Sequence, residues 1–295
     1  MSLTKTLPYR SPLIALVAAA LLLAGCSGSS EKIKVDPTEK AYVPRGRALV
    51  QGLAACGQCH GSKSNPRAAL SGGQKFSDIY GEVFAPNLTS SKIKRWSAAD
   101  FVSTFRKHST PEDRELAVEH HRGYEWMADE DAFAIAAYIR SLPTVMNDVE
   151  IRDLSSVTKY TTGILENRVS VEGYVPAIPR REIAAYGKYL VDHVARCSSC
   201  HNKPETLFGE EDYLAGGREI SRNGVTKIAP NITGSETFGI GEWSEDEIIR
   251  FLSTGKPPGS SFRQVDICPT EFYSLAAPED LAAIAHYIRS VETNT

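Results

Sequence analysis

The chain has 295 residues, with 33 Lys and Arg against 36 Asp and Glu, and a formal net charge of -3. This charge balance, without a long basic tract, argues against a nucleic-acid partner, and the length suits about two domains. The first 26 residues are typical of a signal peptide, because Lys5 and Arg10 precede an apolar run, 13–24, that is too short for an ordinary membrane-spanning helix.

The apolar run ends in Leu23-Ala24-Gly25-Cys26. Small residues followed by a cysteine resemble the signal of a bacterial lipoprotein, in which Cys26 is lipidated and becomes the new N-terminus. Two or three acyl chains anchor a protein stably to a lipid membrane. Ser27, rather than Asp, follows the cysteine, and by resemblance to Gram-negative lipoproteins this favours the outer membrane. We therefore expect a lipid-anchored protein facing the periplasm, with residues 27–44 as a flexible tether.

The remainder of the chain contains one pattern twice. Five segments recur in the same order. Equivalent residues lie 141 positions apart at the first cysteines and 149 apart at the last helices. The first copy contains GRALVQGLAACGQCH (46–60), SGGQKF (71–76), FAPNLT (84–89), RWSAADFVSTF (95–105) and DEDAFAIAAYIRSLP (129–143), and the second contains GKYLVDHVARCSSCH (187–201), AGGREI (215–220), IAPNIT (228–233), EWSEDEIIRFL (242–252) and PEDLAAIAHYIRS (278–290).

Each copy has helical patterns. Apolar residues recur at helical spacing before each CxxCH sequence. Ser97 with Asp100, and Ser244 with Glu247, predict capping boxes, and acidic residues open the last helix of each copy. We predict a mainly α protein with one domain at 45–143, a linker at 144–182 that packs between or across the domains, and a second domain at 183–295.

The two CxxCH sequences are typical of covalent haem attachment. Their residues are Cys56, Cys59 and His60 in the first copy and Cys197, Cys200 and His201 in the second. Two thiols at this spacing reach the two vinyl groups on one edge of a porphyrin, and the histidine then supplies a nitrogen to the iron. A zinc ribbon needs a further ligand pair and a thioredoxin-like site needs a βαβ context, so we predict two covalently bound haem c groups.

With these motifs together, the chain resembles the dihaem c-type cytochromes that serve as electron-transfer subunits of bacterial dehydrogenases. The resemblance covers roughly 45–142 and 185–290, and it implies two tandem class I cytochrome c-like domains. A carbonyl or the asparagine of each APN[IL]T loop could lie near the haem propionates or the histidine of CxxCH, although the loop also fits a tight turn. Trp96 and Trp243 are expected in the core.

In the family that the chain resembles, a Met-Pro pair ahead of the last helix supplies the sixth iron ligand. The only methionines here are Met1, Met127 and Met146, so the second copy has none. Cys268-Pro269 stands in the Met-Pro position and predicts a thiolate ligand, since a metal lowers the thiol pKa. A buried cysteine that packs as a small apolar residue is one alternative, and His193 or His286 as the ligand is another, although both also fit packing or surface positions.

The equivalent window in the first copy contains His120 and His121. Imidazole is a good haem ligand, so we expect one of them at the sixth position, with a marginal preference for His120. Met127, His108 and an open site remain alternatives. Histidine and thiolate ligands favour ferric iron more than a thioether does, so both haems should have lower potentials than the Met-ligated family, and the Cys268 haem the lower of the two.

The expected function is electron transfer between redox partner proteins, because no phosphate-binding loop for a flavin or nucleotide is present. The alternative is a haem enzyme with His/Cys ligation that oxidises thiosulfate or a related sulfur compound. Basic residues near Cys268 could hold such an oxyanion, namely Lys256, Arg263 and Arg250. A dihaem peroxidase would need an open coordination site and motifs that are not evident in this sequence.

Overall fold

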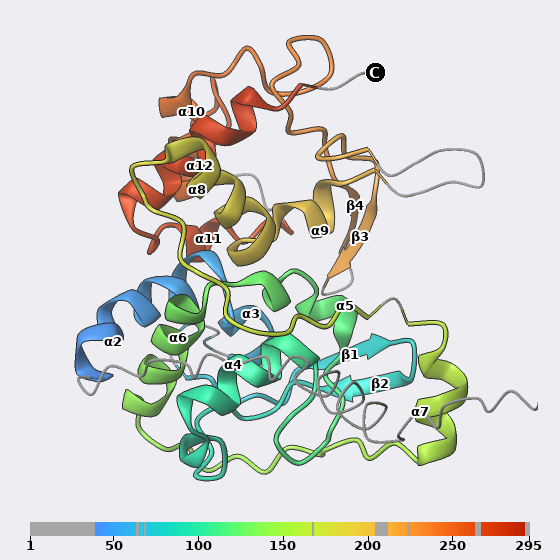
Figure 1. Ribbon diagram of the computed structural model, residues 1–295. Coiled ribbons are helices and arrows are strands. Elements are labelled where there is room, and N and C mark those ends of the chain that lie inside the picture. Colours follow the sequence, from blue (N-terminus) through green and yellow to red (C-terminus); the bar gives the residue numbers. More distant parts are fainter. Residues whose placement is uncertain are drawn as a thin grey trace, which may run out of the picture. The chain divides into compact units, whose positions relative to one another are not determined.

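The computed structural model describes residues 39–62, 65, 67, 69–166, 168–203, 212–222, 225–262 and 267–292. These residues are mainly helical (Figure 1), which confirms the predicted class. In this part of the chain, no helix has the length and the apolar content needed to cross a membrane. The predicted signal and Cys26 lie outside the described residues. Helix α2 begins at Glu39, inside the segment 27–44 that was expected to be a tether.

The elements of the first copy follow one another as helices interrupted by one hairpin. They are α2 (Glu39–Ala48), η2 (Leu49–Leu53), α3 (Gly57–His60), β1 (Lys75–Asp78), β2 (Gly81–Phe84), η3 (Ile93–Arg95), α4 (Ala98–Lys107), α5 (Val118–His121), η4 (Tyr124–Trp126) and α6 (Asp129–Ser141).

The second copy repeats the order of the principal elements. It contains α8 (Ile183–Tyr189), η5 (Leu190–Val194), α9 (Cys197–His201), β3 (Glu219–Arg222), β4 (Val225–Ile228), α10 (Glu245–Thr254), α11 (Thr270–Tyr273) and α12 (Pro278–Ser290). The described residues of both copies belong to one compact unit, so the division into two tandem domains stays a prediction.

In each copy the first helix packs against the last helix, α2 against α6 and α8 against α12 (Figure 1). A glycine lies where the two helices cross. A Cβ atom added to Gly46 would lie 1.9 Å from the Ala134 carbonyl oxygen, and one added to Gly187 would lie 2.1 Å from the Ala283 carbonyl oxygen. Any larger residue at either position would therefore separate the helices.

Both predicted capping boxes are present. The Ser97 hydroxyl accepts a hydrogen bond from the Asp100 backbone N–H, while the Asp100 carboxylate accepts one from the Ser97 N–H. Ser244 and Glu247 make the same pair of contacts at the start of α10. These boxes satisfy N–H groups at the helix N-termini that have no partner within the helix.

Two antiparallel hairpins were not predicted from the sequence. Strand β1 pairs with β2, and β3 pairs with β4, each over four residue pairs. Each hairpin follows the Gly-Gly pair of its copy. Gly72 and Gly216 have φ values of +70° and +74°, which residues with a side chain rarely adopt. The turn leads the chain from the CxxCH helix into the hairpin and then into the APN loop.

The connector at 144–182 contains helix α7 (Ser156–Gly163), which the β-branched sequence did not predict. The connector packs across the first copy. Arg152 forms a bidentate ion pair with the buried carboxylate of Asp78 in β1, and the Asp129 N–H donates to the Val175 carbonyl. The connector therefore contacts β1 and the start of α6 in the first copy, whereas its role as a linker between or across two domains stays a prediction.

A buried polar cluster joins α2 and α6 of the first copy to α8 and α12 of the second. The Arg45 guanidinium makes a two-pronged contact with Asp131 and a further ion pair with Asp280. The Tyr186 hydroxyl donates to Asp280 at 2.7 Å, and the Tyr189 hydroxyl donates to Asp131 at 2.8 Å. Such a cluster specifies how the two copies pack, because each buried charge needs its partner.

Candidate functional site

The CxxCH residues of the first copy lie on α3, at the edge of a mainly apolar cavity of about 480 Å³. Cys56, Cys59 and His60 all line this cavity, together with aromatic and aliphatic side chains of α4, α6 and the hairpin. Neither cysteine forms a disulfide. Burial raises the pKa of the Cys56 thiol to about 12. Two thiols and an imidazole at the edge of an apolar cavity fit the attachment edge of a haem.

The histidine of each motif is held by the proline of the following APN loop. His60 Nδ1 lies 2.9 Å from the Pro86 carbonyl oxygen, and His201 Nδ1 lies 2.8 Å from the Pro230 carbonyl oxygen. Because Nδ1–H donates to a carbonyl, the neutral ring carries its proton on Nδ1, which is the tautomer that ligates a metal through Nε2. The prediction that a loop carbonyl lies near this histidine is confirmed in both copies.

The asparagine of the first APN loop holds the loop in shape. Asn87 Oδ1 accepts hydrogen bonds from the Thr89 backbone N–H and hydroxyl, and its Nδ2 donates to the Val145 carbonyl of the connector at 2.9 Å. Asn231 makes the same contacts with Thr233 in the second copy. The interpretation of this loop as a tight turn is therefore also correct, since one motif both closes the turn and presents the carbonyl.

His121 lies opposite His60 across the first cavity, with 6.3 Å between the two ring centroids. Its Nδ1 lies 2.9 Å from the Ala117 carbonyl oxygen, so its Nε2 is also left for a metal. Burial lowers the pKa of His121 to about 3, against the hydrogen bond to Ala117. His121 is thus a neutral imidazole at neutral pH, which is the form that coordinates metal.

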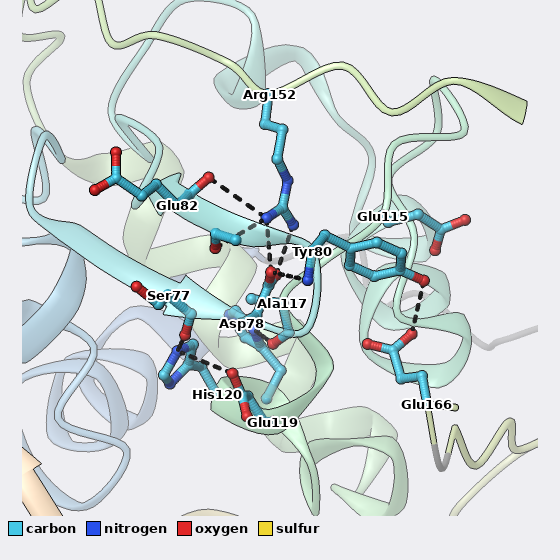
Figure 2. A network of polar contacts seen from close by, with 12 residues as sticks. Ser77, Asp78, Tyr80, Glu82, Glu115, Ala117, Glu119, His120, Arg152 and Glu166 are labelled. Atoms are coloured by element: carbon cyan, nitrogen blue, oxygen red, sulfur yellow. Dashed lines mark hydrogen bonds and ion pairs between the residues drawn. The ribbon is translucent and has the colours of Figure 1, made fainter. Parts of the chain in front are cut away.

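His120 lines the same cavity, but its ring contacts the backbone of β1 (Figure 2). Its Nε2 lies 3.1 Å from the Ser77 carbonyl oxygen of β1, and its ring packs edge-on against Phe76 with 5.5 Å between centroids. Figure 2 also shows the ion pair between Arg152 and Asp78, which is the next residue of the hairpin after Ser77. The marginal sequence preference for His120 over His121 therefore has no support in the geometry.

Met127 and His108 of the first copy lie outside the cavity lining. Met127 is fully buried in the hydrophobic core, and its carbonyl accepts a hydrogen bond from Arg106. His108 is also fully buried, with Nε2 3.4 Å from a Glu125 carboxylate oxygen. Neither residue therefore faces the space in which His60 and His121 meet.

Trp96 and Trp243 are half-buried against the core, in agreement with the packing role predicted for them. Trp96 and Trp243 pack against the core, each edge-on to a phenylalanine, with ring centroids 5.5 and 5.6 Å apart. They contribute to the packing of equivalent helices in the two copies.

In the second copy, Cys268 is half-buried beside the CxxCH motif and packs against the same core as Cys197. Burial raises the pKa of Cys197, and the nearby Cys268 raises it further. The same two causes, burial and the cysteines, raise the pKa of Tyr273. The fold thus gathers Cys197, Cys200, Cys268 and Tyr273 in one place, although Cys268 and Cys197 are far apart in sequence.

Two of the three basic residues named for a sulfur substrate, Arg250 and Lys256, are described, and these two are exposed and do not form a defined anion site. Arg250 is exposed and lies 3.8 Å from Glu247 within its own helix. Lys256 is exposed beyond the end of that helix, and Arg263 lies outside the described residues.

Paired thiols with a carbonyl-held imidazole on an apolar cavity are the arrangement by which a chain attaches haem c covalently. No family model matches the chain. Several curated proteins are similar to it, among them the following three. The fructose dehydrogenase cytochrome subunit of Gluconobacter japonicus is 28% identical over 96% of this chain. The gluconate 2-dehydrogenase cytochrome c subunit of Pantoea cypripedii is 27% identical over 87%. The diheme cytochrome c-type protein of Cereibacter sphaeroides is 26% identical over 92%.

These relatives confirm the resemblance to cytochrome c subunits of bacterial dehydrogenases, and they support electron transfer as the general function. The chain spans 60% of the fructose dehydrogenase subunit and 61% of the gluconate dehydrogenase subunit. It spans 96% of the diheme protein.

Proposed function

We propose that this chain is a dihaem c-type cytochrome lipoprotein that passes single electrons between redox partner proteins in the periplasm. Cys56 and Cys59 would attach one haem, with His60 as an iron ligand. Cys197, Cys200 and His201 would do the same for the other. The observation that carries the proposal is the duplicated contact between each histidine and its proline carbonyl, at 2.9 and 2.8 Å. When bound, the haems supply one-electron chemistry, and the chain holds and orients them.

For the first haem we propose that His60 and His121 would be the two residues that hold the iron. Two metal–nitrogen bonds of about 2 Å each, together with the distance from each coordinating nitrogen to its ring centre, would place the two ring centroids roughly 6 to 6.5 Å apart. The centroid separation of His60 and His121 is 6.3 Å. Both rings also donate Nδ1–H to a backbone carbonyl, which fixes the tautomer that coordinates through Nε2.

For the second haem we propose Cys268 opposite His201. Its proximity to Cys197 and Tyr273 supports this assignment, as does the absence of any methionine after Met146. A thiolate ligand stabilises ferric iron more than imidazole, and imidazole more than a thioether. Both haems should therefore have low potentials, and the haem with Cys268 the lower of the two.

The relatives named as subunits of fructose and gluconate dehydrogenases support a dehydrogenase as the electron donor. We further propose a lipid anchor at Cys26, with the protein on the outer membrane. None of these relatives is named for sulfur chemistry, and Arg250 is already paired. We therefore do not carry the thiosulfate alternative further.

The test is the mass and the haem content of the exported full-length protein. We expect two haem adducts, one fewer after Cys56→Ala/Cys59→Ala and one fewer after Cys197→Ala/Cys200→Ala. Cys268→Ala is the matched control, because its thiol should bind iron without a covalent link to porphyrin, and two adducts should remain. A protein without any adduct would contradict the whole proposal, and a single adduct would contradict the dihaem assignment.

A further inference from the structure

Arg196 belongs to the second copy by sequence but lines the cavity of the first. It immediately precedes Cys197 and begins α9 in the left-handed conformation, with φ +53°. Its side chain lines the cavity that contains Cys56, Cys59 and His60. Arg196 is therefore adjacent in sequence to the second CxxCH motif, while its side chain lines the cavity of the first.

The guanidinium of Arg196 lies over the ring of Tyr124, with 4.3 Å from Cζ to the ring centroid. Tyr124 is buried, and its hydroxyl donates to the Ala54 carbonyl at 3.0 Å, so the ring is fixed beside the first motif. Arg196 Nη1 lies 3.3 Å from the Arg122 carbonyl oxygen. These contacts hold the charge in one place, as a cation over a buried aromatic ring.

A glycine of the first copy, Gly123, leaves room for the Arg196 side chain. Gly123 has φ +102°, and a Cβ atom added to it would lie 3.4 Å from both Cγ and Cδ of Arg196 and 2.7 Å from the Asp192 carbonyl oxygen. The residue that precedes the first CxxCH motif is Ala55, which shares the left-handed conformation with φ +44° but has no long side chain. The two copies therefore differ at this position, and only the second has a charged residue directly before its CxxCH motif.

Arg196 has no carboxylate partner among the described residues. Its Nε–H is buried there without an acceptor, and its contacts are the Tyr124 ring and one carbonyl. A charge that is partly removed from water lowers the stability of the folded state unless it is paired with an opposite charge.

The charge of Arg196 reaches both motifs. Burial raises the pKa of Cys56, and Arg196 opposes this increase. Burial lowers the pKa of His121, and the hydrogen bond to Ala117 opposes this decrease. His60 and then Arg196 lower the same pKa further. Arg196 itself has a raised pKa, against the cost of burial, because of Tyr124 and then Cys200 and Cys59.

We propose that Arg196 is a positioning residue shared by both haem sites, whose half-buried positive charge raises the reduction potential of both haems. The inference rests on the proposed function. A bound haem would supply one-electron chemistry, and an electron accepted from a reduced partner would lower the charge of the site by one unit without a bond or a proton being exchanged. A fixed cation between the two attachment edges favours that product at each site, and thereby offsets part of the low potential that the axial ligands impose.

The experiment is a redox titration of the full-length dihaem protein, followed by EPR so that the two ferric haems are observed separately. Haem content is measured first in every variant, so that failure of haem attachment, which would contradict the proposed function, is distinguished from failure of this inference. Arg196→Gln should lower both potentials, by an amount equal to about a tenfold or larger decrease in each equilibrium constant for reduction. Arg196→Lys should retain most of the effect, because it keeps the charge.

The matched control is Arg122→Gln, which removes the same charge from an exposed neighbouring side chain and should leave both potentials nearly unchanged. Because a buried glutamine can impair folding, Arg196→Met is measured beside it as a second neutral variant. The inference is wrong if neither neutral variant shifts the potentials, if only one haem responds, or if the lysine variant shifts them as far as the neutral variants do.

Discussion

The imidazole rings of His60 and His121 face each other across one cavity with their centroids 6.3 Å apart. His60 comes from α3 and His121 from the short helix α5, and each ring is held at Nδ1 by a backbone carbonyl. This separation is the one that an iron atom between two coordinating rings would need. The pair therefore predicts which substitutions change the first haem and which leave it intact.

Replacing His121 should change the first haem alone. His121→Met substitutes a thioether for imidazole and should raise the potential of that haem, and His121→Ala should remove its low-spin EPR signal. His120→Ala is the matched control, because His120 bonds to Ser77 and should leave the spectrum unchanged. If His120→Ala, and not His121→Ala, removed the signal, the ligand assignment would be reversed.

Replacing Cys268 should change only the second haem. Cys268→Ala should abolish the low-spin thiolate signal in EPR of the ferric protein, and Cys268→Met should restore six-coordination with a higher potential. Both variants should keep two haem adducts. Unaltered spectra in Cys268→Ala would show that this cysteine is a packing residue near Cys197 and no ligand.

Removing the Asn87 side chain should destabilise the loop that presents the Pro86 carbonyl. Asn87→Ala leaves buried groups of Thr89 and the connector without partners, and it should cost about 1 to 3 kcal/mol of unfolding free energy. The less buried Asn231→Ala should cost less. Denaturant unfolding of the holoprotein measures both, and equal costs would argue against the connector contact.

Arg45 should be a major contributor to the packing of the two copies. Arg45→Met leaves the buried carboxylates of Asp131 and Asp280 without their cation and should cost about 3 kcal/mol or more in denaturant unfolding. Lys75→Met is the control, because the Lys75–Glu82 ion pair of the first hairpin is exposed on both sides and should contribute below about 1 kcal/mol. Similar costs for both variants would contradict the central role of Arg45.

Membrane attachment should depend on Cys26 alone. Cys26→Ala should release the protein from the membrane fraction and leave the haem sites intact, because one or more acyl chains are lost. Ser27→Asp should keep the protein lipidated and move it from the outer to the inner membrane. Both outcomes are read by fractionation and by the mass of the N-terminal peptide. Membrane association that survives Cys26→Ala would overturn the anchor.

The choice between His120 and His121 shows where local pattern stops being informative. Adjacent residues of a helix point about 100° apart, so only one of the two can face His60. The position of α5 against the hairpin decides which one, because the His120 ring bonds to the Ser77 carbonyl and the His121 ring bonds to the Ala117 carbonyl. No sequence signal within the window distinguishes them.

The hairpins and helix α7 were missed for a similar reason. Strand β1 is four residues long and half-exposed, so it has no apolar alternation to detect. Helix α7 has no buried residue, and a β-branched run there has low intrinsic helix propensity. The capping boxes were predictable because both partners lie within one turn of the chain.

The sequence by itself determined the duplication, the two CxxCH motifs, the mainly helical class and the helix caps. Each of these depends on residues that are close together in the chain or on a pattern that repeats along it. Only the tertiary structure decided that His121 faces His60, that Arg45 joins Asp131 to Asp280, and that Arg196 of the second copy lines the cavity of the first. These residues are far apart in sequence. They meet only because burial of the apolar helical faces folds the first copy on itself and brings the two copies together.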